Sequence, residues 1–179
     1  MALLITLVAR GALLLGILSP GICQAQAFNE YQVKAAFLYT FAKFVEWPAQ
    51  AFSSPSAAMT ICVLGEDPFG GFLDETVKGK TIGDRPLAVY RIAELSAGRD
   101  CKILFISISE RSRTPALLAS MATSGLLTVG DTAEFTTQGG IIGLRRDGER
   151  IRLSVNLAAA EKAKLRISSR VLSLATIVR

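Results

Sequence analysis

The chain has 179 residues, a formal net charge of +5 at pH 7 and no histidine. Without histidine it cannot form a Ser-His-Asp triad, a Cys-His pair or a histidine-bound zinc centre, which excludes most hydrolase mechanisms. The cysteine spacing fits no metal site either, so we expect no metal, no cofactor and no enzymatic activity.

Residues 1–27, "MALLITLVARGALLLGILSPGICQAQA", have the features of a secretory signal peptide. An apolar run interrupted by Arg10 ends in a small-residue pattern, which predicts cleavage after Ala27. The weakly positive start leaves an uncleaved membrane anchor as an alternative, although Pro20 argues against a continuous spanning helix. Lipidation at Cys23 is a second alternative, but the isoleucine before it is larger than such cleavage sites normally accept.

Cleavage leaves residues 28–179 as a single domain, a length that can bury a hydrophobic core. Within it, residues 141–179 contain nine lysines and arginines against three acidic residues. A positive surface of this kind suits an acidic partner, a phospholipid surface or nucleic acid. Export makes nucleic acid the least expected of the three.

Two cysteines, Cys62 and Cys101, remain after cleavage. In an oxidising compartment they are most simply a disulfide, and closing the loop between them would stabilise the fold by roughly 4 kcal/mol in the chain-entropy model. Two separate buried thiols are the alternative.

The first predicted element is an amphipathic helix over residues 29–46, which ends before Pro48. Its apolar face is formed by Val33, Phe37, Phe41 and Phe44, and its polar positions by Glu30, Lys34, Lys43 and Glu46. The helix has more aromatic surface than one face requires, and aromatic residues are enriched at interfaces. We therefore expect Tyr39 and Trp47 to lie at a dimer or partner surface.

Apolar runs then alternate with helical segments along the chain. The predicted strands are 59–65, 85–92, 101–109 and 126–130, and the predicted helices are 69–79, with Asp67 as its N-cap, and 113–125. Strands without polar alternation, separated by helices, indicate a sheet that is covered on both faces.

The C-terminal part changes character. Residues 139–156 hold two strands joined at Asp147-Gly148, and helices are predicted over 157–165 and 169–178. The predicted fold is a single α/β domain with a mainly parallel, helix-covered sheet, an antiparallel edge hairpin near the C-terminus and the N-terminal amphipathic helix.

Asp131 and Glu134 follow a predicted strand with the spacing of a capping box, in which each side chain bonds a backbone N–H at a helix start. Capping is the favoured interpretation, and a pair of catalytic acids is the alternative.

Four polar residues, Glu66, Asp67, Ser107 and Ser109, lie where two predicted strands end, which is where doubly wound folds bind ligands. They are the basis of an alternative function, a periplasmic small-molecule binding or sensing protein. The serines have no base nearby and are predicted to act in caps and turns rather than as nucleophiles.

The predicted hairpin is rich in arginine. Arg150 and Arg152 fall on one face of a strand, since alternate residues share a face, and Arg145 lies on the preceding strand. These three arginines either contact a partner or form a solvated edge that blocks aggregation, and the sequence leaves both open.

Five stretches, taken in order, resemble the YfiR family of periplasmic proteins. They are "VKAAFLYTFAKFVEWP", "ICVLGEDPFG", "CKILFIS", "LLTVGDTAEFTTQGGIIGL" and "IRLSVNLAAAEKAKLRISSRVLSLA". The resemblance extends over residues 31–177 and rests on the ordered set, because no single stretch is specific.

The resemblance implies a regulator without chemistry of its own. Relatives are dimeric periplasmic repressors that bind the periplasmic part of an inner-membrane diguanylate cyclase, and so limit cyclic di-GMP and biofilm formation. An OmpA-like outer-membrane lipoprotein relieves the repression by sequestering the repressor. Cys62 and Cys101 match a disulfide of the family, whereas a second, close cysteine pair of the best-known relative has no counterpart here.

Overall fold

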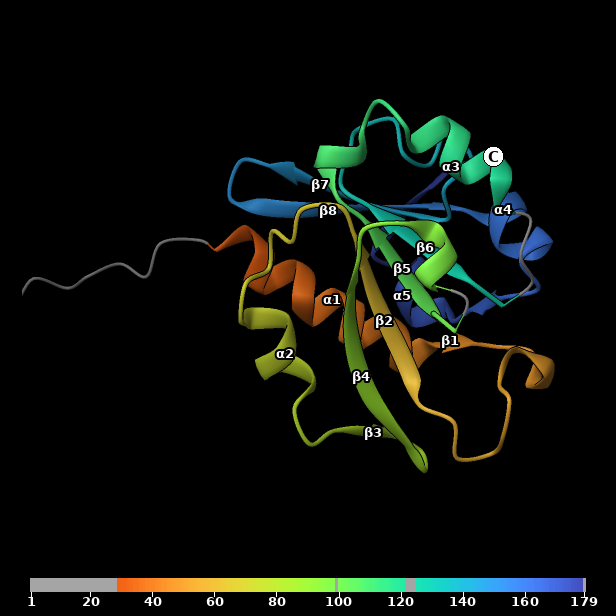
Figure 1. Cartoon of the computed structure of the whole chain (residues 1–179). Helices are drawn as coiled ribbons and strands as arrows, with labels where there is room; N and C mark the ends of the chain where they lie inside the picture. Colours follow the sequence, from red (N-terminus) through yellow and green to blue (C-terminus); the bar gives the residue numbers. More distant parts are fainter. Residues whose placement is uncertain (1–28, 99, 122–124, 179) are drawn as a thin grey trace, which may run out of the picture.

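The structure, a computed structural model, describes residues 29–98, 100–121 and 125–178, and Figure 1 shows their arrangement. The predicted signal peptide lies outside these residues. The α-helices in the described part are α1 Glu30–Phe44, α2 Phe72–Val77, α3 Thr114–Ser120, α4 Leu157–Lys162 and α5 Ser169–Leu172. The strands there are β1 Val45–Glu46, β2 Met59–Leu64, β3 Thr81–Ile82, β4 Arg85–Ile92, β5 Ile103–Ile106, β6 Leu127–Gly130, β7 Ile142–Asp147, β8 Arg150–Asn156, β9 Arg166–Ile167 and β10 Ala175–Val178.

The main sheet has eight strands within these ranges, in the order β10-β8-β7-β6-β5-β2-β4-β3. From β4 through β2, β5 and β6 to β7, each strand runs parallel to its neighbour. β8 returns antiparallel to β7, and β10 lies parallel to β8 at the outer edge. The predicted α/β fold with a mainly parallel sheet and an antiparallel hairpin near the C-terminus is confirmed.

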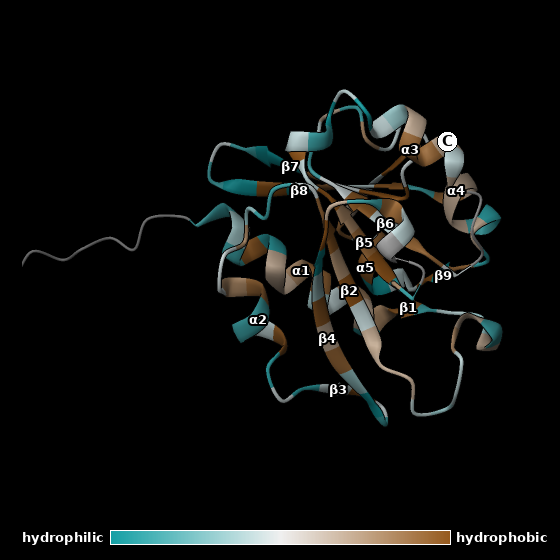
Figure 2. Ribbon diagram, in the orientation of Figure 1, coloured by the Kyte–Doolittle hydropathy of each residue, from teal (hydrophilic) through white to brown (hydrophobic). Residues whose placement is uncertain are grey.

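The central strands are buried on both faces. Every residue of β2, β5 and β6 is buried, which explains why their sequences are apolar almost throughout. Alternate side chains enter different cores: Ile61 and Val63 join the larger core under α1, whereas Cys62 and Leu64 join a smaller one beneath α3. Figure 2 shows the hydrophobic colour along these strands and the hydrophilic colour at the tip of the β7–β8 hairpin.

The last predicted helix, residues 169–178, is wrong in its second half. α5 ends at Leu172, and Ala175–Val178 form β10 beside β8. Three of the four residues of β10 are β-branched, and such residues favour a strand when a sheet edge is available. The tail therefore adds a strand outside the hairpin.

Asp67 is not the N-cap that the sequence predicted. Its Oδ1 accepts a hydrogen bond from the backbone N–H of Phe69 (2.8 Å), which stabilises a turn. α2 begins only at Phe72, because Gly70 has a φ of +54°, a left-handed conformation that interrupts a helix.

The hairpin turn lies one residue later than predicted. Asp147 pairs with Arg150, so the two-residue loop is Gly148-Glu149. Gly148 has a φ of +61°, the conformation that the first position of such a loop favours. The short antiparallel pair of β1 and β9 was not predicted, since two-residue strands show no periodicity.

Candidate interaction surfaces

Cys62 in β2 and Cys101, just before β5, form a disulfide. Their Cα atoms are 5.8 Å apart, within the usual range, and both residues are buried in the smaller core. Because β2 and β5 are adjacent parallel strands, the bond holds neighbouring parts of the sheet together. The predicted disulfide is confirmed, and the alternative of two separate thiols is wrong.

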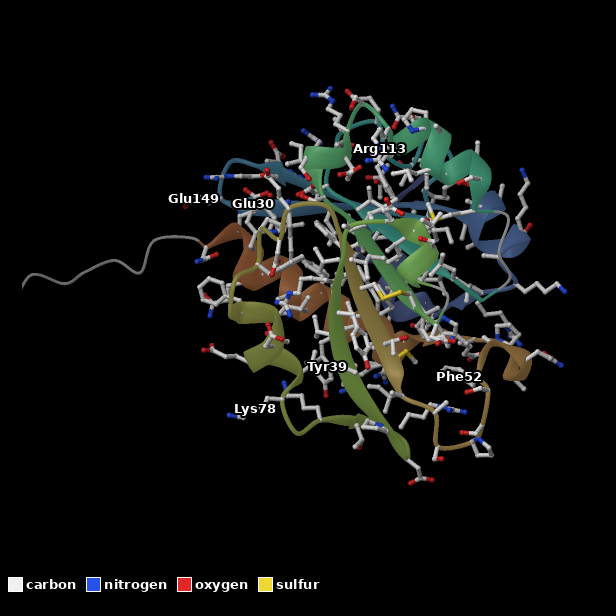
Figure 3. The ribbon with its side chains drawn as sticks, viewed as in Figure 1. Glu30, Tyr39, Phe52, Lys78, Arg113 and Glu149 are labelled. Carbon is white, nitrogen blue, oxygen red and sulfur yellow. A yellow bond between two sulfur atoms is a disulfide. The ribbon has the colours of Figure 1, made fainter. Side chains whose placement is uncertain are left out.

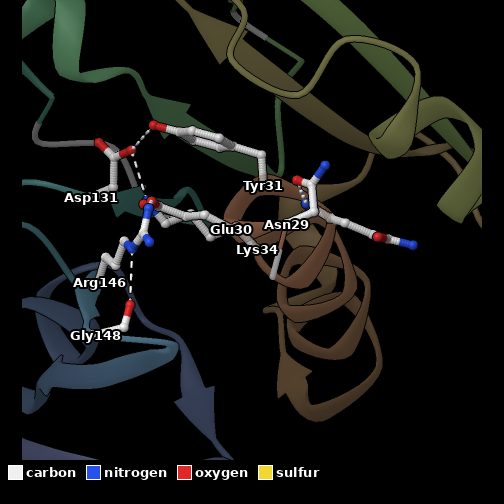
Figure 4. A network of polar contacts seen from close by, with 8 residues as sticks. Asn29, Glu30, Tyr31, Lys34, Asp131, Arg146 and Gly148 are labelled. Carbon is white, nitrogen blue, oxygen red and sulfur yellow. Dashed lines mark hydrogen bonds and ion pairs between the residues drawn. The ribbon is translucent and has the colours of Figure 1, made fainter. Parts of the chain in front are cut away.

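A buried cluster of charges joins α1 to the end of β6, as Figure 4 shows. Lys34 is 1% exposed, and its ammonium donates to Asp131 Oδ2 (3.0 Å) and to Glu30 Oε1 (2.5 Å). The hydroxyl of Tyr31 donates to the same Asp131 oxygen (3.0 Å). Lys34, which the sequence placed among the polar positions of the helix, therefore lies on its buried face.

The buried face of α1 is rotated relative to the predicted one. Its fully buried positions are Lys34, Ala35, Leu38, Phe41 and Ala42, and the aromatic side chains of Phe37 and Phe44 are only half-buried. Positions 34, 38 and 41 share one helix face, but a lysine is rarely buried unless a partner charge from elsewhere in the chain meets it.

Asp131 does not form a capping box with Glu134, because the residues after β6 make turns and no helix starts there. Asp131 faces α1, whereas Glu134 lies on the surface beside Arg111 (3.3 Å). Burial, and then the negative charge of Asp131, raise the pKa of Tyr31, so its hydroxyl stays protonated and keeps donating. The two carboxylates also do not form a pair of catalytic acids.

The β7–β8 hairpin contacts α1 through Arg146, which reaches this cluster. Arg146 Nη1 lies 3.4 Å from Glu30 Oε2, and its Nε donates to the carbonyl of Gly148 (2.9 Å). Arg152 Nε donates to Asp147 Oδ2 (2.8 Å), and this bond lowers the pKa of the Asp147 carboxyl. The hairpin is therefore stabilised by hydrogen bonds within it and by the contact between Arg146 and Glu30 of α1.

The three predicted partner residues of the hairpin are exposed. Arg150 and Arg152 alternate with the more buried Ile151 and Leu153, as predicted. Within the described ranges, Arg145 and Arg150 take part in no ion pair. The hairpin therefore presents positive charge that the fold does not neutralise.

The aromatic residues predicted to contact a partner lie near the amino ends of the parallel strands. The Tyr39 ring lies between the ammonium groups of Lys80, 4.3 Å from its centroid, and Lys43, at 5.5 Å. The half-buried Trp47 donates from Nε1 to the carbonyl of Lys102 (3.3 Å), just before β5.

The aromatic set lies near the amino ends of the parallel strands, whereas the arginine set follows the carboxyl end of β7. Figure 3 shows Tyr39 and Phe52 at one end of the molecule and Glu149, in the hairpin loop, at the other. The residues predicted as one partner-binding set therefore form two separate surfaces, which we name the aromatic edge (Tyr39, Trp47) and the arginine hairpin (Arg145, Arg150, Arg152).

The four residues of the predicted ligand crevice bond within the protein. The backbone N–H of Glu66 donates to Ser109 Oγ (3.0 Å), and the N–H of Ser109 donates to Ser107 Oγ (3.5 Å). Asp67 Oδ2 accepts from Arg91 Nε (2.9 Å). The serines act in caps and turns, as predicted, and ligand binding by these four residues stays a prediction.

In the part of the chain that the structure describes, no three histidine, cysteine, aspartate or glutamate side chains gather where they could hold a metal ion. None of the helices described there has the length and apolar character needed to cross a membrane.

Two solved structures share the fold. A conserved domain protein of Vibrio cholerae is 12% identical, with a TM-score of 0.57, and the match covers 81% of this chain and 60% of that one. An ABC domain of Streptococcus pneumonia in complex with L-Trp is 10% identical, with a TM-score of 0.53, covering 84% of this chain and 61% of that one. This chain thus spans about three fifths of each structure, and at these identities the likeness shows the fold alone.

No curated protein matches the chain significantly. A family model described as YfiR/HmsC-like matches residues 31–176, which is nearly the whole of the part described by the structure. Except for Glu30, the match includes α1 and the buried cluster, and it includes the disulfide and the arginine hairpin. The chain therefore belongs to the YfiR/HmsC-like family.

Proposed function

We propose that this protein is a periplasmic interaction protein that negatively regulates an inner-membrane diguanylate cyclase by binding its periplasmic part. The observation that carries the proposal is the family match over residues 31–176. The protein reaches the periplasm through the signal peptide of residues 1–27, which is cleaved after Ala27.

The arginine hairpin is the surface proposed to bind the cyclase. Arg145 and Arg152 stand directly opposite each other on the antiparallel pair, and like charges in this arrangement are destabilising. Asp147 forms its ion pair with Arg152, and its negative charge also acts on Arg145 and Arg150, so one carboxylate is shared among three arginines. An acidic surface on the cyclase would relieve the remaining repulsion and would accelerate association by electrostatic attraction.

The aromatic edge is proposed as the surface between two copies in a homodimer. Tyr39 and Trp47 are partly exposed, and aromatic residues with partly covered rings are typical of interface cores. Because this edge is separate from the hairpin, a dimer can bind the cyclase while the contact between its two copies is kept.

Repression then follows from differential binding. A protein that binds the inactive form of the cyclase more tightly shifts the population toward that form. An OmpA-like outer-membrane lipoprotein that takes up the repressor would remove this bias, and cyclic di-GMP would rise.

The test is the level of cyclic di-GMP in a strain that lacks the gene. We expect deletion to raise the level and the wild-type gene to restore it. Arg145→Gln with Arg150→Gln should restore it poorly, because the hairpin loses charge while its backbone is kept. Arg113→Gln is the matched control, an exposed arginine outside the hairpin. An unchanged level on deletion would contradict the cyclase assignment, and full restoration by the double variant would contradict the hairpin assignment.

A further inference from the structure

A cavity of about 540 Å³ lies between α3 and α4, on the face of the sheet opposite to α1. Its floor includes Leu126 and Ile141, and its walls include Leu118 and Met121 on the α3 side and Ala159 in α4. This volume falls within the range of about 300–1,000 Å³ that is typical of small-molecule sites.

The cavity exists because α4 has small side chains where it faces α3. Ala158, Ala159 and Ala163 line one wall, and a larger residue at these positions would fill the space.

The lining is mainly aliphatic and carries one charge. It contains no aromatic ring and no carboxylate among the described residues, and Lys162 in the last turn of α4 is its one charged side chain there. Lys162 forms no ion pair with any described residue.

Two further polar groups have hydrogen-bonding capacity left. Thr128 Oγ1 accepts from the backbone N–H of Ile141 (3.0 Å), which leaves the hydroxyl proton of Thr128 for a ligand. The side-chain amide of Gln138 bonds to none of the described residues. Asn156, in contrast, is occupied, since it donates to the carbonyl of Thr136 and accepts from the N–H of Ala159.

We propose that this cavity binds a small aliphatic monocarboxylate, with its carboxylate at Lys162 and its chain over Leu118, Met121 and Leu126. The single unpaired cation matches one negative charge, and donors at Thr128 and Gln138 suit carboxylate oxygens. The aliphatic walls suit a flexible hydrocarbon chain, whereas an aromatic ligand would find no ring to stack on. The site is separate from the arginine hairpin and the aromatic edge, so it does not depend on the proposed repressor function.

The test uses the mature protein with octanoate as the probe and 1-octanol as its uncharged counterpart, with binding measured by calorimetry. We expect octanoate to bind the wild type. Lys162→Gln should weaken octanoate binding at least tenfold and leave 1-octanol binding within twofold, because only the charge contact is removed. Lys78→Gln, an exposed lysine remote from the cavity, should change neither affinity.

Ala159→Phe, which fills the cavity, should abolish the binding of both probes. Lys162 is exposed, so Lys162→Gln tests the site even if Ala159→Phe fails to fold, which circular dichroism would reveal. An absence of octanoate binding to the folded wild type would overturn the proposal. Equal octanoate affinity for the wild type and Lys162→Gln would also overturn it, as would unchanged binding to folded Ala159→Phe.

Discussion

At the scale of single residues, Lys34 shows the largest difference between the prediction from sequence and the structure. It lies on the buried face of α1 because Asp131, 97 positions later, and Glu30 neutralise it. Asp131 Oδ1 has no hydrogen-bond partner in the described part of the chain, so the aspartate depends on Lys34 and Tyr31 for compensation. A buried pair of this kind contributes little over an apolar pair but is costly to break.

Lys34→Met should lower the free energy of unfolding by about 3 kcal/mol, because it leaves the Asp131 carboxylate buried without its cation. Adding Asp131→Asn should recover part of this loss, since the second change removes the uncompensated charge. Urea denaturation of the single and double variants measures both values. Lys78→Met, at an exposed position, should change stability by less than about 0.5 kcal/mol. Strictly additive losses in the double variant would contradict the coupling.

Asp74 makes the stability of the folded protein depend on pH. Arg91 binds its carboxylate through two nitrogens (2.5 and 2.8 Å), and this hydrogen bonding lowers the pKa of Asp74 in the folded protein. Because the pKa of Asp74 is lower in the folded protein, its pairing with Arg91 stabilises the fold fully above the unfolded pKa of about 3.9. This stabilisation is lost as the pH falls through the folded pKa.

Asp74→Asn should therefore destabilise the protein at pH 7 by about 0.5 kcal/mol, a value typical of an exposed pair. The difference from the wild type should shrink to nothing as the pH falls below the folded pKa. Thermal unfolding of both proteins between neutral and acidic pH measures it. A difference that stays constant over this range would show that Asp74 acts through packing and not through its charge.

At the scale of elements, the disulfide connects β2 to the segment that leads into β5, across 39 positions of sequence. The two strands pair in parallel from Ile61 and Ile103 onward, so the disulfide joins segments that are already neighbours in the native sheet. Its contribution arises mainly in the unfolded state, where it closes the loop.

Replacing Cys62 and Cys101 together by serine should lower the free energy of unfolding by roughly 4 kcal/mol in the chain-entropy model. The urea midpoint of the wild type, measured with and without a reductant, gives an independent value for the same bond. The serine variant serves as the control for the reductant and should show no shift when it is added. Equal midpoints for the oxidised and reduced wild type would contradict a stabilising role.

At the scale of the whole molecule, the aromatic edge lies near the amino ends of the parallel strands, and the arginine hairpin follows the carboxyl end of β7. The two surfaces can therefore be tested separately, because a substitution in one should leave the other intact. A variant at the aromatic edge should affect self-association first, and a variant of the hairpin should affect capture of the cyclase first.

Trp47→Ala should shift the sedimentation of the mature protein toward the monomer, because it removes the largest ring of the proposed dimer surface. The hydrogen bond to the Lys102 carbonyl is lost as well, so a circular dichroism spectrum is needed to show that the fold is kept. Arg145→Gln, in the hairpin, should leave sedimentation unchanged. Wild-type sedimentation of folded Trp47→Ala would contradict the assignment of this edge.

The sequence predicted the fold class, four strands of the parallel sheet, the disulfide and the arginine alternation of β8. These features depend on local pattern: buried strands need apolar runs, and exposed hairpins need alternation. It misplaced Lys34, Asp131 and the second half of the last helix. Each of these errors involves a partner distant in the sequence, which no local pattern reveals.

By itself, the sequence determined that this chain forms a helix-covered parallel sheet, because its apolar runs could be buried in no other way. Only the tertiary structure decided that Lys34 is compensated by Asp131, that the tail adds β10 beside β8, and that the aromatic and arginine residues lie toward opposite ends of the parallel strands. The physical reason is that the charge or strand edge meeting each of these residues comes from a different part of the chain, and only folding brings the two together.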